Sequence, residues 1–320
     1  MIYSRVVCLG AGVLLWAAAG AGGGGQTKDP ATAAQASEQQ EFTIQTTSRL
    51  VLLDVSVKDA AGGFVSGLTK DDFKVFENGK PEGISQFANS DIPVTVGVAV
   101  DESGSMGPKK AQVVTAALVF FHDSNPKDEI FVVNFNEKAR RGLPDDVLFS
   151  DNMQLLRSAL WQGDPEGRTA LYDAIEMSLD QLKFGRQAKK TLVVISDGGD
   201  NHSTHTQQEV MQDVLSSLAT IYTVGIYDED DPEKNDGVLR KLAQVSGGVF
   251  YHLEKLEEIV PICRQIAKDI RTRYTIGYVP AAEGKVVRHI KVTASSPDHP
   301  KLIVRTRTSY EFSDKAAESR

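Results

Sequence analysis

The sequence predicts an α/β protein in which a doubly wound, mostly parallel sheet is inserted into a β-sandwich-like domain built from the two flanks. In the middle, about residues 92–272, continuous apolar strands alternate with helices, as in a parallel sheet that is buried on both faces. The flanks, residues 41–91 and 273–313, each hold only a few short strands. Because chain insertions between nearby termini are tolerated, we expect the two flanks to form one domain.

The N-terminal segment, residues 1–21, has the features of a secretory signal. Arg5 precedes an apolar run that ends in the small residues Ala19-Gly20-Ala21, which fit a cleavage site. The run is short and rich in Ala and Gly for a membrane span, although an uncleaved membrane anchor is the alternative. Residues 22–40 follow as a flexible linker because they contain almost no core-forming side chains.

Composition is ordinary for a soluble globular protein, with 41% hydrophobic and 24% charged residues among 320. Cleavage after residue 21 removes one arginine and no acid, which leaves 34 basic and 43 acidic side chains and a net charge of −9. Nucleic acids and anionic membranes are bound through basic patches. The acidic balance therefore argues against both as partners.

One of the two cysteines lies in the signal segment, so the remaining one, Cys263, has no partner for an internal disulfide. It stands at helical spacing with Ile259, Ile266 and Ile270. This pattern predicts a residue of the core rather than a reactive thiol.

The N-terminal flank begins with an alternating strand at 49–59. The segment 73–87 then predicts two short strands around Asn78-Gly79, a strong signal for a tight hairpin turn. The C-terminal flank adds alternating segments at 273–279, 286–294 and 301–312, and a polar tail at 314–320.

The middle region predicts five strands and six helices in alternation. The strands are expected at 93–101, 129–136, 191–200, 219–228 and 248–253. The helices are expected from Pro108 to about 121, then at 152–161, at 170–182, after the capping box Thr206-x-x-Glu209, at 236–247 and at 255–270.

Polar side chains gather where two of these strands end. Asp101 closes the first strand and is followed by Ser103 and Ser105, while Asp197 closes the strand that begins near residue 191. Between them, Thr169 stands just before a predicted helix. In such sheets ligands bind outside the carboxyl ends of the strands, and hydroxyl and carboxylate oxygens suit Mg²⁺ or Ca²⁺.

These segments, "DESGSM", "GRTALYDAI" and "VVISDGGDN", resemble the metal-ion-dependent adhesion site of von Willebrand factor A domains. The resemblance covers about residues 92–272 and implies a Rossmann-like fold. The flanking segments "GLTKDDFKVFENGKP" and "YTIGYVP" resemble a bacterial exported group of such proteins.

The resemblance implies a role for each of the five residues. Serines like Ser103 and Ser105 bind the ion directly, and threonines like Thr169 bind it in the high-affinity state. Aspartates like Asp101 and Asp197 act mostly through water. The ion is then Mg²⁺, or Mn²⁺ or Ca²⁺, and an Asp or Glu of a partner protein fills its open position.

Other interpretations remain. Asp101 and Ser103 could merely cap the following helix. Neither serine of the motif fits the G-x-S-x-G pattern of a nucleophile. His202 and His205 are expected to be solvated or to contact ligand, because no further zinc ligands stand nearby. The acidic segment 227–237 lacks the glycine and glutamate register of an EF-hand.

We therefore expect an exported, periplasmic or extracellular binding module that is not an enzyme and has no membrane span after signal cleavage. The alternative is a metal-assisted hydrolase, for which only His202, His205 or Asp200 could act as base. A scaffold that has lost its metal is a third possibility. The identity of the partner and the oligomeric state stay open at this point.

Overall fold

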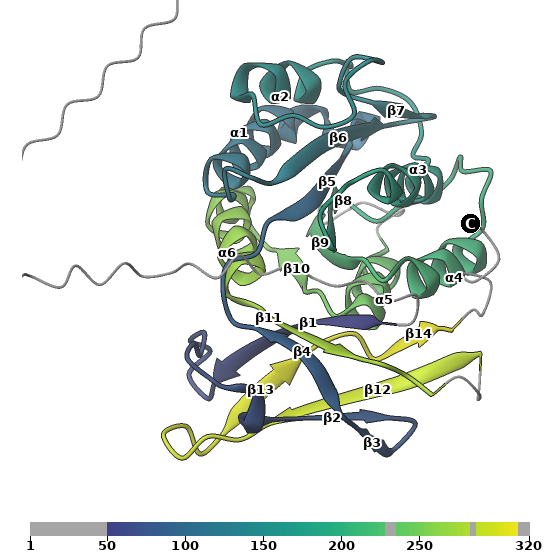
Figure 1. Ribbon diagram of the computed structural model, residues 1–320. Coiled ribbons are helices and arrows are strands. Elements are labelled where there is room, and N and C mark those ends of the chain that lie inside the picture. Colours follow the sequence, from purple (N-terminus) through teal and green to yellow (C-terminus); the bar gives the residue numbers. More distant parts are fainter. Residues whose placement is uncertain (1–49, 228–234, 282–285, 313–320) are drawn as a thin grey trace, which may run out of the picture. The chain divides into compact units, whose positions relative to one another are not determined.

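The computed structural model describes residues 50–227, 235–281 and 286–312 (Figure 1). The predicted signal (1–21), the linker (22–40), the tail (314–320) and most of the acidic segment 227–237 lie outside these residues. None of the helices in the described ranges has both the length and the apolar character needed to cross a membrane.

A six-stranded sheet occupies the middle of the chain, in the order β10-β9-β8-β5-β6-β7. All neighbours are parallel except β6 and β7, so the predicted fold class is confirmed. The strands are β5 (Val94–Asp101), β6 (Glu129–Phe135), β7 (Ala139–Arg141), β8 (Lys189–Ser196), β9 (Thr220–Ile226) and β10 (Phe250–Leu253).

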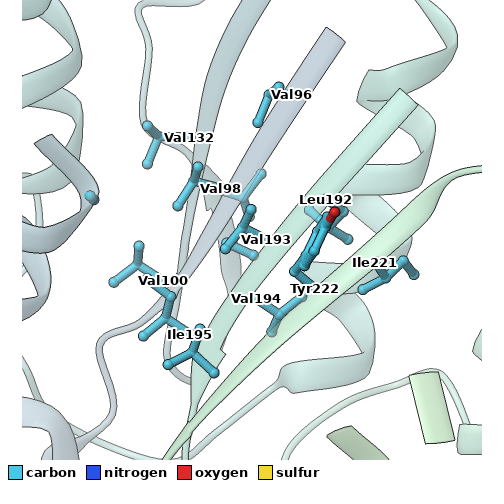
Figure 2. Close-up of a cluster of buried hydrophobic side chains, with 14 of the residues drawn as sticks. Val96, Val98, Val100, Val132, Leu192, Val193, Val194, Ile195, Ile221 and Tyr222 are labelled. Carbon is cyan, nitrogen blue, oxygen red and sulfur yellow. The ribbon is translucent and has the colours of Figure 1, made fainter. Parts of the chain in front are cut away.

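Helices cover both faces of this sheet, with α1, α2 and α6 on one side and α3, α4 and α5 on the other (Figure 1). Their bounds are α1 (Lys110–His122), α2 (Met153–Leu160), α3 (Leu171–Lys183), α4 (Gln207–Ser217), α5 (Asp236–Ser246) and α6 (Ile259–Thr272). Every residue of β5, β6 and β9 is buried, as expected for strands that are covered twice. Figure 2 shows side chains of neighbouring strands gathered in this core, among them Val98, Val193 and Ile221.

Two antiparallel sheets complete the structure, in the orders β13-β1-β11-β4 and β14-β12-β2-β3. Each contains strands from both flanks, and a second hydrophobic core lies between them. Neither flank could therefore form either sheet by itself. The strands are β1 (Val51–Asp59), β2 (Phe73–Glu77), β3 (Lys80–Glu82), β4 (Ile84–Ala88), β11 (Tyr274–Tyr278), β12 (Val287–Ala294), β13 (Leu302–Arg305) and β14 (Ser309–Glu311).

The predicted hairpin between β2 and β3 is confirmed. Asn78 and Gly79 have φ values of 48° and 81°, so both lie in the left-handed region that a two-residue type I′ turn requires. The chain then continues into β4, which leaves this sheet and pairs with β11 of the other.

Residues 301–312 do not form the single strand that their alternation suggests. They split into β13 and β14, which belong to different sheets. The break falls at Arg307, which is buried and donates a hydrogen bond to the Ala219 carbonyl at 3.2 Å. The backbone of Thr308 likewise approaches Val245 of α5, with N–H to O at 3.4 Å. These contacts with the helical region turn the chain from one sheet to the other.

The first helix also begins later than predicted. Residues Gly104–Lys109, which include Pro108, form a 3₁₀ turn, and α1 starts at Lys110. Cys263 is 1% exposed, and burial raises the pKa of its thiol to about 12, so its assignment to the core is confirmed.

A buried polar network joins β1 to the parallel-sheet region. Asp269 of α6 accepts hydrogen bonds from Ser56 at 2.6 Å, from Tyr222 at 2.7 Å and from Arg273 at 3.0 Å. On the same face of β1, Asp54 forms an ion pair with Lys189 at 3.3 Å. Burial alone raises the pKa of Asp269, but Arg273 and the hydroxyl donors outweigh it, and the net pKa lies below its usual value.

We predict that Asp269→Asn destabilises the protein by about 3–5 kcal/mol, because it leaves the Arg273 guanidinium buried without its counter-charge. Since the folded pKa of Asp269 lies below the unfolded value of 3.8, its contribution is present above pH 3.8 and is lost as pH falls through the folded pKa. Urea denaturation of wild type and variant at several pH values measures the difference.

The matched control is Asp180→Asn, which breaks an exposed ion pair with Lys183 on α3. It should cost at most about 1 kcal/mol. Equal stabilities for Asp269→Asn and wild type near neutral pH would show that the network contributes nothing.

Candidate metal centre

The strand order reverses at β5, and the predicted site residues lie at this point. β5 pairs with β6 on one side and with β8 on the other. Asp101 is the last residue of β5, and Asp197 directly follows β8. Both are 3% exposed. The sheet therefore presents two buried carboxylates side by side at the crevice where ligands of such sheets bind.

A chain of hydroxyl groups connects the two carboxylates. Ser103 Oγ and Ser105 Oγ lie 3.1 Å apart, and Ser105 donates to Asp197 Oδ2 at 2.7 Å. Ser196 donates to Asp101 Oδ2 at 2.6 Å from the neighbouring strand. Four of the five residues singled out in the sequence thus belong to one cluster of oxygen atoms.

Ser103 does not act as a helix cap. It precedes the 3₁₀ turn Gly104–Lys109, yet its side chain makes no capping hydrogen bond and lies beside Ser105 instead. Its backbone N–H donates to Asp101 Oδ1 at 2.8 Å, so Asp101 shapes the loop that carries both serines. The capping interpretation therefore accounts for part of the role of the Asp101 carboxylate. It does not account for the positions of the Ser103 and Ser105 hydroxyls.

Thr169, the fifth residue, is 5% exposed and is tied to both neighbouring loops through backbone contacts. Its N–H donates to the Asn201 side chain at 2.9 Å, and its carbonyl accepts from Asn201 and His202 N–H at 3.0 and 3.1 Å. Two residues earlier, the Gly167 carbonyl accepts from Gly104 N–H at 3.2 Å. These bonds bring the Thr169 segment against the loops that follow β5 and β8.

Glycine is required directly after Asp197. Gly198 has φ of +78°, and a Cβ at this position would lie 2.4 Å from the Asn235 carbonyl oxygen. The chain can therefore turn sharply here, and Gly199 N–H donates to Asp197 Oδ1 at 3.1 Å. The turn holds this carboxylate in place at the end of the sheet.

The two carboxylates destabilise each other. Burial, together with the charge of Asp197, raises the pKa of Asp101 to about 7, although hydrogen bonds from Ser103 and Ser196 oppose the rise. A cation between the carboxylates would remove this repulsion. The electrostatics of the site therefore fit a bound cation.

The donor atoms fit a hard cation. Hydroxyl and carboxylate oxygens are ligands of Mg²⁺, Ca²⁺ and Mn²⁺, whereas zinc prefers histidine and cysteine. Across the part of the chain that the structure describes, no three His, Cys, Asp or Glu side chains are grouped to hold a metal. His205 hydrogen-bonds to Asp173 with Nδ1 2.7 Å from Oδ1, which accounts for one of the two histidines near the site.

The sequence analysis missed the role of Glu102, which lies between Asp101 and Ser103. Its buried carboxylate pairs with Lys110 at 2.9 Å and with Arg140 at 3.2 Å. Lys110 also donates to the Gly163 carbonyl, and Glu166 N–H donates to the Glu102 carbonyl at 3.0 Å. Glu102 therefore fixes the loop of the two serines to the segment that leads to Thr169. A glutamate between two motif residues gives no sign of this role.

Asp173 was missed as well. On the first turn of α3, its carboxylate accepts hydrogen bonds from the backbone N–H groups of Thr204 and His205, both at 3.0 Å. With the His205 imidazole, these bonds attach the loop after β8 to the helix that follows Thr169. An acidic residue in the first turn of a helix is common, so its sequence position alone carries no signal.

Comparison with known proteins agrees with this architecture. Residues 96–200 match the family described as von Willebrand factor type A domain. Inter-alpha-trypsin inhibitor heavy chain H4 of Homo sapiens is 22% identical over 278 residues, which are 80% of this chain. This chain spans 28% of the length of that relative.

One solved structure supports the fold. A von Willebrand factor type A protein from Catenulispora acidiphila has a TM-score of 0.50 at 14% identity, with 85% of this chain and 76% of that chain covered. An aerotolerance-related membrane protein from Bacteroides fragilis has a TM-score of 0.43 at 17% identity, with 55% and 98% covered. Because the sequence identity is low, the similarity to the Catenulispora acidiphila protein concerns the fold alone.

We predict that the Asp173 carboxylate keeps His205 protonated to higher pH than an ordinary histidine. The hydrogen bond and charge of Asp173 raise the pKa of His205 above 6.5 against a small effect of burial. A raised folded pKa means that this pair stabilises the protein below pH 6.5 and that the contribution is lost as pH rises through the folded pKa. NMR titration of the His205 ring should show this pKa, and Asp173→Asn should lower it.

The control is Asp180→Asn, on the same helix. Asp180 is not among the residues that shift the pKa of His205, so this substitution should leave the titration unchanged. A His205 pKa at or below 6.5 in the wild type would contradict the prediction.

Proposed function

We propose that this chain, whose residues 96–200 match the von Willebrand factor type A domain family, is an exported protein-binding module that captures a carboxylate of a partner protein through a bound divalent cation. One observation carries the proposal. Asp101 and Asp197 are buried at the switch point of the sheet, and Ser103 and Ser105 line the space between them. Such a cluster favours a cation and supplies oxygen ligands for it.

Each of the five side chains has a part in this proposal. Ser103, Ser105 and Thr169 would bind the ion directly, and Asp101 and Asp197 would hold it through water. When bound, the ion supplies an open coordination position with affinity for a carboxylate oxygen. Because the direct ligands are neutral hydroxyls, they leave most of its charge available to an acidic residue from outside. Mg²⁺ is the proposed ion, with Mn²⁺ and Ca²⁺ as the other candidates.

A metal-assisted hydrolase is the second candidate, and the described contacts of the nearby groups favour it less. A hydrolase needs a base within reach of the reacting water. Asp200 Oδ1 instead accepts from Tyr172 N–H at 3.3 Å and lies against the Ser203 hydroxyl. His205 is engaged with Asp173. Of the three candidate bases, this leaves the exposed His202.

Export is proposed from the signal-like segment 1–21, with the cleavage site near Ala21. Sequencing the N-terminus of the protein recovered from the cell envelope or medium tests this part separately. An intact Met1 in the membrane fraction would favour an anchored form.

We predict that Mg²⁺ raises the melting temperature of the wild-type protein, because an ion that binds only the folded state stabilises it by RT ln(1 + [L]/Kd). At a free ion concentration about 100-fold above Kd, the gain is about 2.7 kcal/mol. Asp101→Ala, Ser103→Ala and Thr169→Ala should each reduce this shift. Without metal, Asp101→Ala removes the repulsion with Asp197, which should offset part of the stability lost with the hydrogen bonds from Ser103 and Ser196. Calorimetry and thermal melts measure both effects.

Asp180→Ala, which removes an exposed carboxylate far from the cluster, is the matched control and should respond to Mg²⁺ like the wild type. If millimolar Mg²⁺, Mn²⁺ and Ca²⁺ all left the melting temperature of the wild-type protein unchanged, the proposal would be wrong.

We further predict that partner capture depends on the ion. A pull-down from the native envelope with the immobilised wild-type chain should recover a protein in Mg²⁺ and lose it in chelator. The Asp101→Ala chain should recover none, whereas Asp180→Ala should behave as wild type. Substitution of one acidic residue of the recovered protein should abolish binding. A partner that stays bound in chelator would rule out the metal bridge.

A further inference from the structure

A second polar feature lies away from the metal cluster. It is a cleft of about 470 Å³ between α5 and β10 on one side and the chain from β12 to Thr308 on the other. Its lining includes four basic residues, Arg240, Lys291, Arg305 and Arg307, and no acidic residue. None of the lining residues belongs to the three loops that form the candidate metal centre. In a chain with net charge −8, such a concentration of positive charge calls for a physical explanation.

The position of Arg305 in the sheet directs its side chain toward the helical region. Arg305 stands opposite Ser56 in the antiparallel pair of β13 and β1, so the two side chains lie on the same face. Ser56 donates to Asp269 of α6, which identifies that face as the one that packs against the helices. Arg305 is partly buried there, and its guanidinium forms no ion pair or side-chain hydrogen bond within the described residues.

The surroundings of Arg305 are positive as well. Burial lowers the pKa of the nearby Lys58; Asp269 raises it, while the charges of Arg305 and Arg273 lower it further. Asp269, the acidic group that acts on Lys58, is already bound to Arg273. Arg307 is 4% exposed and donates to backbone carbonyls, and burial lowers its pKa to about 10. Positive charge therefore accumulates here, and Asp269, Asp54 and Asp236 offset it only in part.

The cleft also has apolar walls. Val249, Ile290 and Val304 contribute apolar surface to them. At the cleft's other side, Arg240 stacks on the Phe250 ring at 4.6 Å and forms an exposed ion pair with Asp236 at 3.1 Å. One such contact leaves most of the five guanidinium donors of Arg240 available.

We propose that this cleft binds an organic anion, that is, a molecule with an apolar body and a terminal phosphate or carboxylate group. Arg305 would bind the charged group, Arg240 would add a second cation, and the apolar walls would hold the body. A volume of about 470 Å³ lies in the range of ligand sites, about 300–1,000 Å³, and exceeds what a bare phosphate fills. Guanidinium groups suit both anions because their paired donors match two oxygen atoms.

The experiment uses the full chain with the Asp101→Ala substitution in chelator, so that no anion can bind through the candidate metal centre. Hexyl phosphate is the probe, and titration is followed by the NMR amide signals of Arg305 and Thr306. Hexanoate, inorganic phosphate and hexanol are the comparison ligands. We expect saturable binding of hexyl phosphate or hexanoate, weaker binding of inorganic phosphate, and none of hexanol. Failure of metal binding would not affect this result, which keeps the two proposals separable.

Arg305→Ala should weaken binding of the probe by about tenfold or more, the usual effect of a lost charged hydrogen bond. Arg240→Ala, on the exposed surface of α5, should weaken it as well and provides a second test if Arg305→Ala does not fold. Lys241→Ala is the matched control, since it removes a positive charge from the next residue of the same helix outside the cleft. No signal change with either anion, or unchanged affinity in both arginine variants, would overturn the proposal.

Discussion

The burial of the parallel sheet on both faces is the constraint on which the rest of this structure depends. Strands such as β5 and β6 hold no exposed residue, so polar chemistry is confined to their ends and to the loops beyond them. At the switch point this confinement places Asp101 and Asp197 next to each other, away from water. Two adjacent buried carboxylates repel each other, and this repulsion is the physical argument for the cation proposed above.

The same constraint explains why the cluster needs so many supporting contacts outside its five residues. Loops that leave a buried sheet have no regular hydrogen bonding of their own, so other groups must hold them. Glu102 fixes the first loop to the segment before Thr169 through Lys110, and Asp173 fixes the loop after β8 to α3. Asn201 connects that loop to Thr169 directly. Together these contacts preorganise the ligands, which lowers the entropy cost of binding an ion.

Local patterns predicted much of the fold, because periodicity and turn chemistry act over a few residues. The five parallel strands of the middle region, the capping box at Thr206 and the Asn78-Gly79 turn were all evident in this way, whereas the short antiparallel strand β7 was not predicted. The division of residues 301–312 between two sheets was not, since it depends on contacts of Arg307 with distant carbonyls. Of the five site residues that the motif predicted, four lie in one cluster of oxygen atoms. Glu102 and Asp173 act through partners far away in sequence, which no local pattern reveals.

The buried network between β1 and α6 links the two parts of the fold in a different way from the apolar cores. Each hydrophobic core lies within its own region. Apolar contacts between the regions would be non-directional, whereas the hydrogen bonds of the network fix a single geometry. Asp269 accepts three such bonds from three separate elements or their ends, and Asp54 adds an ion pair with β8. Since β8 leads directly into Asp197, the strand that precedes this carboxylate is held at its opposite end by β1. Because β1 pairs with β11 and β13, this contact connects the strand to residues of both flanks.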